Sequence, residues 1–179
     1  MVVKAYRFAA QKHKGQYRRF TGEEYFVHPV AVSKIVEDMT KDDVLIQVAL
    51  LHDIVEDTDT TLEEVKELFG EDVGELVDQL TETTEKRDGL SKVEYLSKEM
   101  AEMSPAALTV KLADRLDNIQ CLKNDYADKK FPSFAEWYYR QTINIMGNIG
   151  VEGMNEVQSI LGGMIAIDLM YAKIKHGWE

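Results

Sequence analysis

Residues 44–57, VLIQVALLHDIVED, pass directly from an apolar run to a cluster of charged and titratable side chains. Asp42 and Asp43 precede this stretch. Acidic residues at such a position favour the start of a helix, because they cap free backbone N–H groups and complement the helix dipole. We therefore predict one helix that continues through this stretch to Asp57.

The polar end of this predicted helix contains His52, Asp53, Glu56 and Asp57. Positions i, i+1, i+4 and i+5 share one narrow strip of a helix. Three carboxylates and an imidazole beside a core are costly to bury without partners, and a divalent cation removes that cost because both groups are common metal ligands. An exposed helix end with its charges in water explains the strip equally well, so this stretch alone does not decide for a metal.

A second charge lies among apolar residues at Asp114, within the segment KLADRLDN. Asn118 follows one helical turn later on the same face. An ion pair of Asp114 with Arg115 is the alternative explanation, and ion pairs are the common one for a buried carboxylate. With His28 at the start of another helix, His52, Asp53 and Asp114 complete four candidate metal ligands from three helices.

The rest of the chain predicts a single α-helical domain over residues 1–179. The sequence is 45% apolar with only three prolines, so it can bury a core and form long helices. Glycines and polar residues at 15–27 predict an ordered loop. The predicted helices span 3–13, 28–39, 44–57, about 61–70, 71–85, 91–103, 105–122, 133–147 and 156–175. The apolar stripe of the seventh consists of Leu108, Leu112, Leu116 and Ile119.

The charge of the chain argues against one class of partner and leaves another open. A net charge of −11 argues against a nucleic-acid polymer, which requires a basic face. The first nineteen residues contain no Asp or Glu, and their basic residues are Lys4, Arg7, Lys12, Lys14, Arg18 and Arg19. This segment could bind a small anion or form a solvated helix face, and the charge alone favours neither.

The compartment is predicted from what the sequence lacks. Cys121 is the sole cysteine, which fits a reducing compartment, and we interpret it as a small packing residue. We find no signal peptide and no apolar run of about 18 residues, the length that a membrane span needs. We therefore expect a cytoplasmic protein with no membrane segment.

Four blocks of the sequence carry a family resemblance: HKGQYRRFTGEEYFVHP, ALLHDIVEDT, FGEDV and KLADRLDN. In order and spacing they resemble the alarmone hydrolase domain of bifunctional RelA/SpoT proteins and its small stand-alone relatives, which belong to the HD superfamily of metal-dependent phosphohydrolases. The resemblance covers roughly residues 4–122. It implies an all-α HD-domain helical bundle, and residues 123–179 would add extra C-terminal helices.

The resemblance also assigns a metal centre. It implies that His28, His52, Asp53 and Asp114 bind one divalent ion, usually Mn²⁺. Such an ion would lower the pKa of bound water and neutralise charge on phosphoryl oxygens.

Catalytic and substrate-binding residues follow from the same resemblance. Glu56 and Asp57 match an acidic pair that helps activate and orient the attacking water, and either one could take its proton. Arg18 and Arg19 fall in the loop that contacts the base and phosphates of the nucleotide. Asn118 matches a residue near the ribose and the scissile phosphate.

Several residues depart from the family pattern around the substrate. Asp117 stands before Asn118 where many bacterial relatives have histidine, and Gln120 replaces a frequent arginine. Phe20 is unusual beside the two arginines. The resemblance fades after Leu122, and although Tyr138 or Tyr139 could reach the phosphates, a core or surface role is expected for both.

The resemblance implies hydrolysis of the 3′-pyrophosphate of ppGpp or pppGpp to GDP or GTP and pyrophosphate. Two alternatives stay open: another nucleotide substrate, either an adenine alarmone or the 2′-phosphate of NADPH, and a catalytically idle alarmone-binding module. The sequence ends without a synthetase segment, so we expect degradation and not synthesis. A homo-oligomer is possible, and the sequence does not decide its size.

Overall fold

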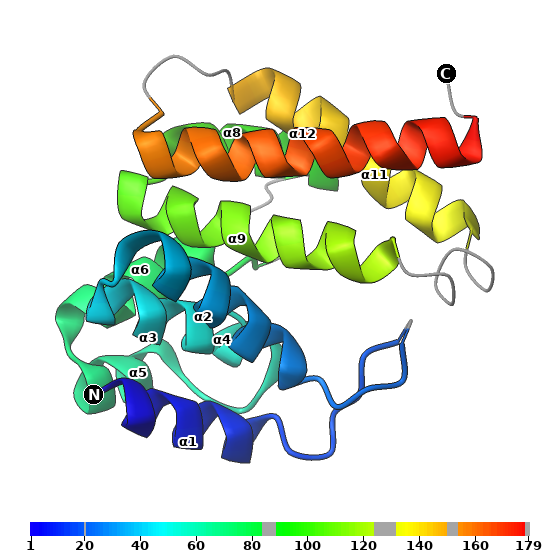
Figure 1. The fold of residues 1–179 in the computed structure, drawn as a ribbon. Coiled ribbons are helices and arrows are strands. Elements are labelled where there is room, and N and C mark those ends of the chain that lie inside the picture. The colour runs from blue at the N-terminus through cyan, green and yellow to red at the C-terminus, as the bar shows by residue number, and fades with distance from the viewer. Residues whose placement is uncertain (20, 84–88, 124–131, 150–153, 178–179) are drawn as a thin grey trace.

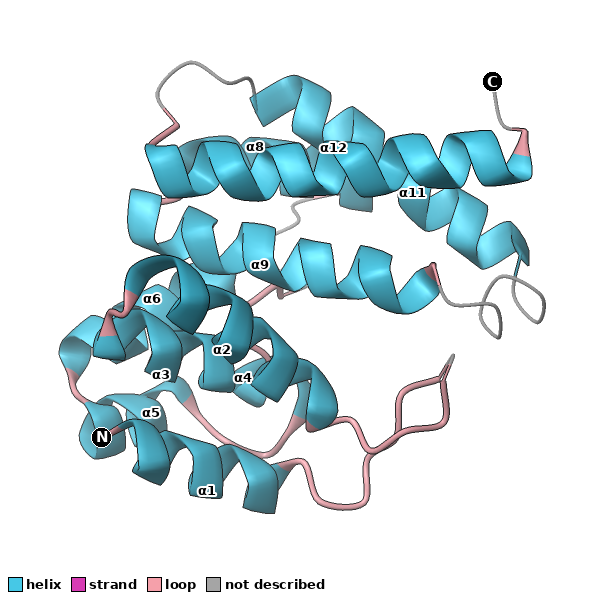
Figure 2. Ribbon diagram, viewed as in Figure 1, coloured by secondary structure: helices cyan, strands magenta, loops and turns pink. Residues whose placement is uncertain are grey.

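The computed structural model describes residues 1–19, 21–83, 89–123, 132–149 and 154–177. Within these ranges the chain forms helices and no β-strand (Figures 1 and 2), which confirms the all-α prediction. The helices are α1 (Val2–Lys12), α2 (Val27–Thr40), α3 (Asp43–Leu51), α4 (Ile54–Asp57), α5 (Leu62–Phe69), α6 (Glu71–Leu80), α8 (Lys92–Glu102), α9 (Pro105–Leu122), α11 (Pro132–Ile149) and α12 (Glu156–His176).

Side-chain caps begin the helices near the predicted positions. Asp42 Oδ1 accepts hydrogen bonds from the backbone N–H groups of Val44, at 2.8 Å, and Leu45, at 3.3 Å. The hydroxyl of Thr61 accepts one from the N–H of Glu64 at 3.2 Å. These bonds satisfy N–H groups that have no partner inside the helix, so α3 and α5 begin where the sequence indicates.

The predicted continuous helix over residues 44–57 is wrong at His52 and Asp53. There the chain turns, and α3 is separated from the single turn of α4. His52 Nδ1 lies 2.8 Å from the carbonyl oxygen of Ala49, so the imidazole competes for the backbone acceptor that residue 53 would use in a continuous helix. His52, the first of the two residues after α3, is buried.

The helix predicted over residues 71–85 also ends early. α6 stops at Leu80, and Thr81 has extended backbone angles. The Thr81 hydroxyl donates to the carbonyl oxygen of Val77 at 2.8 Å, and this contact closes the last turn. The chain then runs past α4, where the backbone N–H of Glu82 reaches the carboxylate of Glu56. Residues 84–88 lie outside the described residues.

Two cores share α9, which crosses the middle of the molecule (Figure 1). The N-terminal core is formed by α1, α2, α3, α5 and α6 with Ala107, Val110 and Ala113 of α9. The C-terminal core is formed by α8, α11 and α12 with the opposite face of α9. The predicted stripe of α9 is confirmed in the C-terminal core, but the sequence reading missed the second buried face. The stripe consists of Leu108, Leu112, Leu116 and Ile119.

Among the described residues, α12 is the one helix whose length and composition would allow a membrane crossing. A helix buried in the core of a soluble protein can have the same length and composition. Leu161, Ile165 and Leu169 of α12 are buried in the C-terminal core, and α12 packs against α9. Packing therefore accounts for part of the apolar composition of α12.

Candidate metal centre and active site

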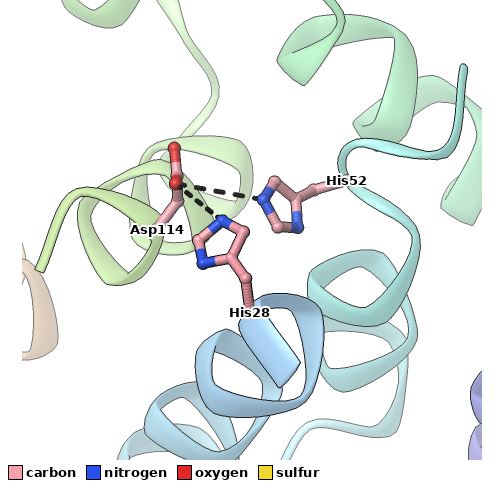
Figure 3. Close-up of side chains that lie close together, drawn as sticks. All are labelled: His28, His52 and Asp114. Atoms are coloured by element: carbon pink, nitrogen blue, oxygen red, sulfur yellow. Dashed lines mark ion pairs between the residues drawn. The ribbon is translucent and has the colours of Figure 1, made fainter. Parts of the chain in front are cut away.

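Three buried side chains from α2, the end of α3 and α9 converge between the two cores (Figure 3). The ligand atoms of His28, His52 and Asp114 all lie within 4.8 Å of one another. Asp114 Oδ1 lies 3.3 Å from His28 Nε2 and 4.0 Å from His52 Nε2. Two imidazole nitrogens and a carboxylate oxygen at this spacing form a donor set typical of a divalent metal site.

The other ring nitrogens fix how the two histidines face the cluster. His28 Nδ1 lies 2.6 Å from Asp117 Oδ2, and His52 Nδ1 lies 2.8 Å from the carbonyl oxygen of Ala49. Both acceptors require an N–H at Nδ1, so Nε2 is the nitrogen that carries the lone pair when each ring is neutral. His52 Nε2 is buried and makes no hydrogen bond. Buried polar atoms without a hydrogen bond are rare, and a metal ion would supply the partner, so these residues fit a divalent cation.

Asp53 lies at the edge of this cluster. Its Oδ2 atom is 3.1 Å from His52 Nε2 and 3.6 Å from His28 Nε2. The Tyr25 hydroxyl donates to the same oxygen at 2.5 Å. All four predicted ligands are thus brought together, and Tyr25, which the sequence reading missed, orients one of them.

The electrostatics of the cluster favour positive charge at its centre. Burial acts to raise the pKa of Asp114, but Lys111 and the two histidines lower it well below its usual range. Burial lowers the pKa of His28, but contacts with Asp114 and Asp117 raise it overall to about 9. The carboxylates are therefore ionised near neutral pH and attract either protons or a cation.

A cavity of about 500 Å³ opens beside the cluster. This volume suits a small-molecule ligand. Its walls combine acidic groups near the cluster with basic groups contributed by three parts of the chain, which suits a ligand that carries several negative charges. The basic residues are Arg18, Arg19, Lys92, Lys111 and Arg115.

Glu56 and Asp57 lie on α4 and contribute to the cavity wall, one turn beyond Asp53 as the sequence predicts. Glu56 accepts a hydrogen bond from the backbone N–H of Glu82. The surrounding protein shields the carboxyl groups from water; this raises the pKa of Glu56 to about 7 and raises that of Asp57. A carboxylate with a pKa near neutrality can accept a proton during a reaction at that pH.

The predicted substrate-binding residues form a network with the cluster. Arg18 donates from Nη1 to Asp117 Oδ2 at 3.1 Å and from Nη2 to Asn118 Oδ1 at 2.9 Å. Asn118 in turn donates to Asp114 Oδ1 at 2.6 Å. Arg18 therefore lies in the cavity wall and is connected to the candidate ligand Asp114 through one side chain. Arg19 also lines the cavity.

Part of the basic N-terminal segment is engaged elsewhere. Lys12 pairs with Asp59 at 3.0 Å and with Glu64 at 3.6 Å, and the ammonium group of Lys4 donates to the carbonyl oxygen of Leu68 at 2.6 Å. These two lysines therefore bind neighbouring elements and are not among the cavity residues.

Lys111 and Arg115 of α9 line the cavity, which was not predicted from the sequence, although both residues flank Asp114 in KLADR. Lys111 Nζ lies 3.3 Å from Asp114 Oδ2. Arg115 donates to Thr142 Oγ1 at 3.1 Å and lies over the ring of Tyr138 at 5.2 Å. Among the described residues, Asp114 pairs with Lys111 of the same helix and not with its neighbour Arg115, so the ion pair considered from the sequence exists with a different partner.

The far wall of the cavity comes from α11. Phe134, Trp137 and Tyr138 line it, whereas Tyr139 is only 1% exposed in the C-terminal core. Of the two tyrosines considered from the sequence, Tyr138 is thus the one at the cavity. Phe20 lies outside the described residues.

The helical fold and the cluster of candidate metal ligands are typical of one protein family. The HD domain family matches residues 5–136, which is most of the chain, and the chain belongs to this family. Within it the alarmone hydrolase resemblance is confirmed by a human relative, named guanosine-3′,5′-bis(diphosphate) 3′-pyrophosphohydrolase MESH1. That protein is 37% identical over 143 residues, which cover 76% of this chain and 79% of the relative.

Other relatives agree. The GTP pyrophosphokinase rsh of Brucella melitensis is 40% identical over 162 residues, which cover 87% of this chain but only 21% of that protein. The chain therefore spans about a fifth of the length of this longer relative. A solved structure of a metazoan ortholog of SpoT, described as hydrolysing ppGpp and acting in starvation responses, has a TM-score of 0.77, 30% identity and 92% coverage of both chains.

Proposed function

We propose that this protein removes the 3′-pyrophosphate of ppGpp or pppGpp in a metal-dependent hydrolysis, giving GDP or GTP and pyrophosphate. One observation carries the proposal: the buried cluster of His28, His52 and Asp114, in which His52 Nε2 makes no hydrogen bond, borders a cavity with basic walls. The names of the human and metazoan relatives support the choice of substrate.

In this proposal His28, His52, Asp53 and Asp114 hold one divalent ion. We propose Mn²⁺, the usual ion of the family that the sequence resembles. The bound ion supplies Lewis acidity, which polarises a phosphoryl oxygen and lowers the pKa of water. Nitrogen and oxygen ligands suit several first-row metals, so a metal panel has to test the choice of ion.

The reaction needs a proton acceptor, and Glu56 and Asp57 are the proposed candidates. The oxygen of a water molecule bonds to the phosphorus next to the ribose 3′-oxygen, and the bond between that phosphorus and the 3′-oxygen breaks. The water gives up a proton to one of the two carboxylates, and the 3′-oxygen gains a proton. The pKa of Glu56, raised to about 7, makes it the better match for accepting a proton near neutral pH.

The basic residues of the cavity wall are the proposed substrate-binding groups. We propose that Arg18 and Arg19 contact the phosphates and the base, and that Asn118 orients the ribose side of the scissile phosphate. Lys111 adds positive charge next to the cluster. Guanidinium groups bind phosphate oxygens through paired hydrogen bonds, so Arg18, already held by two acceptors, presents its remaining N–H groups at low entropic cost.

We also propose that residues 1–179 act as one HD-type domain in the cytoplasm. The sharing of α9 between the two cores supports a single domain.

The experiment that tests the proposal incubates metal-stripped protein with ppGpp, with and without Mn²⁺, and resolves the products by anion-exchange chromatography. We expect GDP and pyrophosphate only when the metal is present. Equal turnover without metal would overturn the metal requirement. Turnover of an adenine alarmone or NADPH but not ppGpp would overturn the substrate. Tight ppGpp binding with no product under any divalent metal would favour the idle module.

A matched pair of variants separates chemistry from general damage. Asp53→Asn changes a carboxylate at the cluster, whereas Asp38→Asn makes the same change on the exposed side of α2, where Asp38 pairs with Lys34. We expect the first variant to lose activity and the second to keep it. Equal activity of both variants would remove Asp53 from the site.

A further inference from the structure

One oxygen atom of Asp117 contacts both the candidate metal centre and the basic wall of the cavity. Its Oδ2 lies 2.6 Å from His28 Nδ1 and 3.1 Å from Arg18 Nη1. The residue lies on α9 one turn after Asp114, and its side chain is 15% exposed. It is also one of the positions where this chain departs from the pattern of its bacterial relatives.

We propose that Asp117 is a positioning residue that aligns the ligand His28 and the cavity residue Arg18 at the same time. This inference deepens the proposed function and rests on it for the role of Arg18. The role of Asp117 at His28 rests on geometry alone.

Asp117 first orients the imidazole of His28. A carboxylate accepts a proton donor and cannot donate one when ionised, so its contact with Nδ1 fixes the N–H at that atom. Nε2 is then the nitrogen that carries the lone pair in the neutral ring, and it lies 3.3 Å from Asp114 Oδ1. A carboxylate behind a ligating histidine fixes both the ring orientation and the tautomer, and it raises the basicity of the ligand.

Asp117 also orients Arg18, which lies in the loop between α1 and α2. Its guanidinium is held by two consecutive residues of α9, because Asp117 accepts from Nη1 and Asn118 accepts from Nη2 at 2.9 Å. Its side chain is only 12% exposed. Two acceptors fix the plane of the guanidinium group, so Arg18 faces the cavity in one orientation.

The two contacts of Asp117 depend on the type of residue at this position. A neutral histidine has a single acceptor nitrogen, so the residue common in bacterial relatives could not accept from both His28 and Arg18. An asparagine could accept at its oxygen but would carry no charge to pair with Arg18. One atom that accepts from His28 and also forms an ion pair with Arg18 therefore requires a carboxylate at position 117.

The test measures metal affinity and kinetics separately on the full chain. Metal-stripped wild type, Asp117→Ala, Asp117→Asn and Arg18→Ala are titrated with MnCl₂ by calorimetry, and kcat and KM for ppGpp follow in saturating metal. We expect Asp117→Ala to bind Mn²⁺ about 10- to 100-fold more weakly and to show a raised KM. Arg18→Ala should raise KM alone, because its removal leaves the contact between Asp117 and His28 in place.

Asp117→Asn sharpens the result, since its amide oxygen still accepts from His28 but makes no ion pair with Arg18. We expect it to recover most of the Mn²⁺ affinity that Asp117→Ala loses, while KM stays raised. Wild-type Mn²⁺ affinity in Asp117→Ala would overturn the role at His28. An equal loss of Mn²⁺ affinity in Arg18→Ala would also overturn it, because the effect would then be a loss of loop structure.

The metal titration needs no substrate, so it remains decisive even if ppGpp is not turned over. In that case the proposed function fails while the role of Asp117 at His28 stands. If Asp117→Ala does not fold by circular dichroism, Asp117→Asn decides alone: wild-type KM in that variant would overturn the proposal.

Discussion

The two cores that share α9 contribute different things to the same cavity. The N-terminal core positions His28 and His52, and α9 supplies Asp114 at the boundary between the cores. The C-terminal core provides the aromatic wall that includes Trp137 and Tyr138. In the proposed function, polar groups among apolar neighbours supply the chemistry on one side, and aromatic residues shape the space for the substrate on the other.

The largest expected effect comes from Asp114→Asn, which removes the charge at the boundary between the cores. A bound metal supplies several kcal/mol of transition-state stabilisation, so activity should fall by about 10³-fold or more. The metal content, measured by atomic emission after gel filtration, should fall as well, while the helical circular dichroism signal stays near wild type. A variant that retains a full equivalent of metal would contradict the assignment of Asp114 as a ligand.

Substitution in the acidic pair should separate proton transfer from metal binding. If Glu56 accepts the proton, Glu56→Gln should lower kcat by about 10²- to 10⁴-fold with metal content unchanged. Because the pKa of Glu56 is raised to about 7, the group is deprotonated above that pH, and wild-type kcat should rise as pH increases through this value. Asp57→Asn is the matched control: a larger loss there would assign the base to Asp57.

Metal affinity itself should depend on pH, because protons compete for the ligands. The pKa of His28 in the metal-free protein is raised to about 9, so near neutral pH the metal must displace a proton from this group. Apparent affinity should therefore rise with pH, by at most about tenfold per unit for one proton released. Calorimetric titrations with MnCl₂ between about pH 6 and 8.5, run in buffers of different ionisation heat, measure the apparent affinity and the number of protons released. A pH-independent affinity would contradict this competition.

The smallest expected effect on activity concerns the aromatic wall. Trp137 lines the cavity and is 47% exposed, so Trp137→Ala should raise KM by about fivefold through the loss of about 1 kcal/mol of ring contact. Tyr139→Ala, two residues later on the same helix, should instead lower the free energy of unfolding by about 3–5 kcal/mol. Kinetics and denaturant unfolding on both variants check the contrast, and a large stability loss in Trp137→Ala would contradict it.

The sequence predicts the N-terminal side well because a polar group in an apolar context is rare and therefore informative. His52 and Asp114 are recognisable since each interrupts a run of core residues, and the structure brings them together. The break of the helix at His52 was not predictable from spacing, because it depends on an imidazole that binds a backbone carbonyl of its own turn.

The C-terminal side was less predictable for a physical reason. Trp137 and Tyr139 look alike in the sequence, and only tertiary packing makes one a cavity residue and the other a core residue. The second buried face of α9 was missed because Ala107 and Ala113 are small, so they give a weak apolar signal. Asp117 was placed near the substrate, but its contact with His28 needs the fold.

The position of α9 between two cores limits how this protein can change. Each residue added to a helix rotates all that follows by about 100°. An insertion between Asp114 and Leu122 would rotate the last turns of α9 away from the C-terminal core, while Asp114 kept its position. Both faces of α9 are in use, so no rotated arrangement satisfies both neighbours. Across its descendants α9 should therefore accept exchanges of side chains but keep its length.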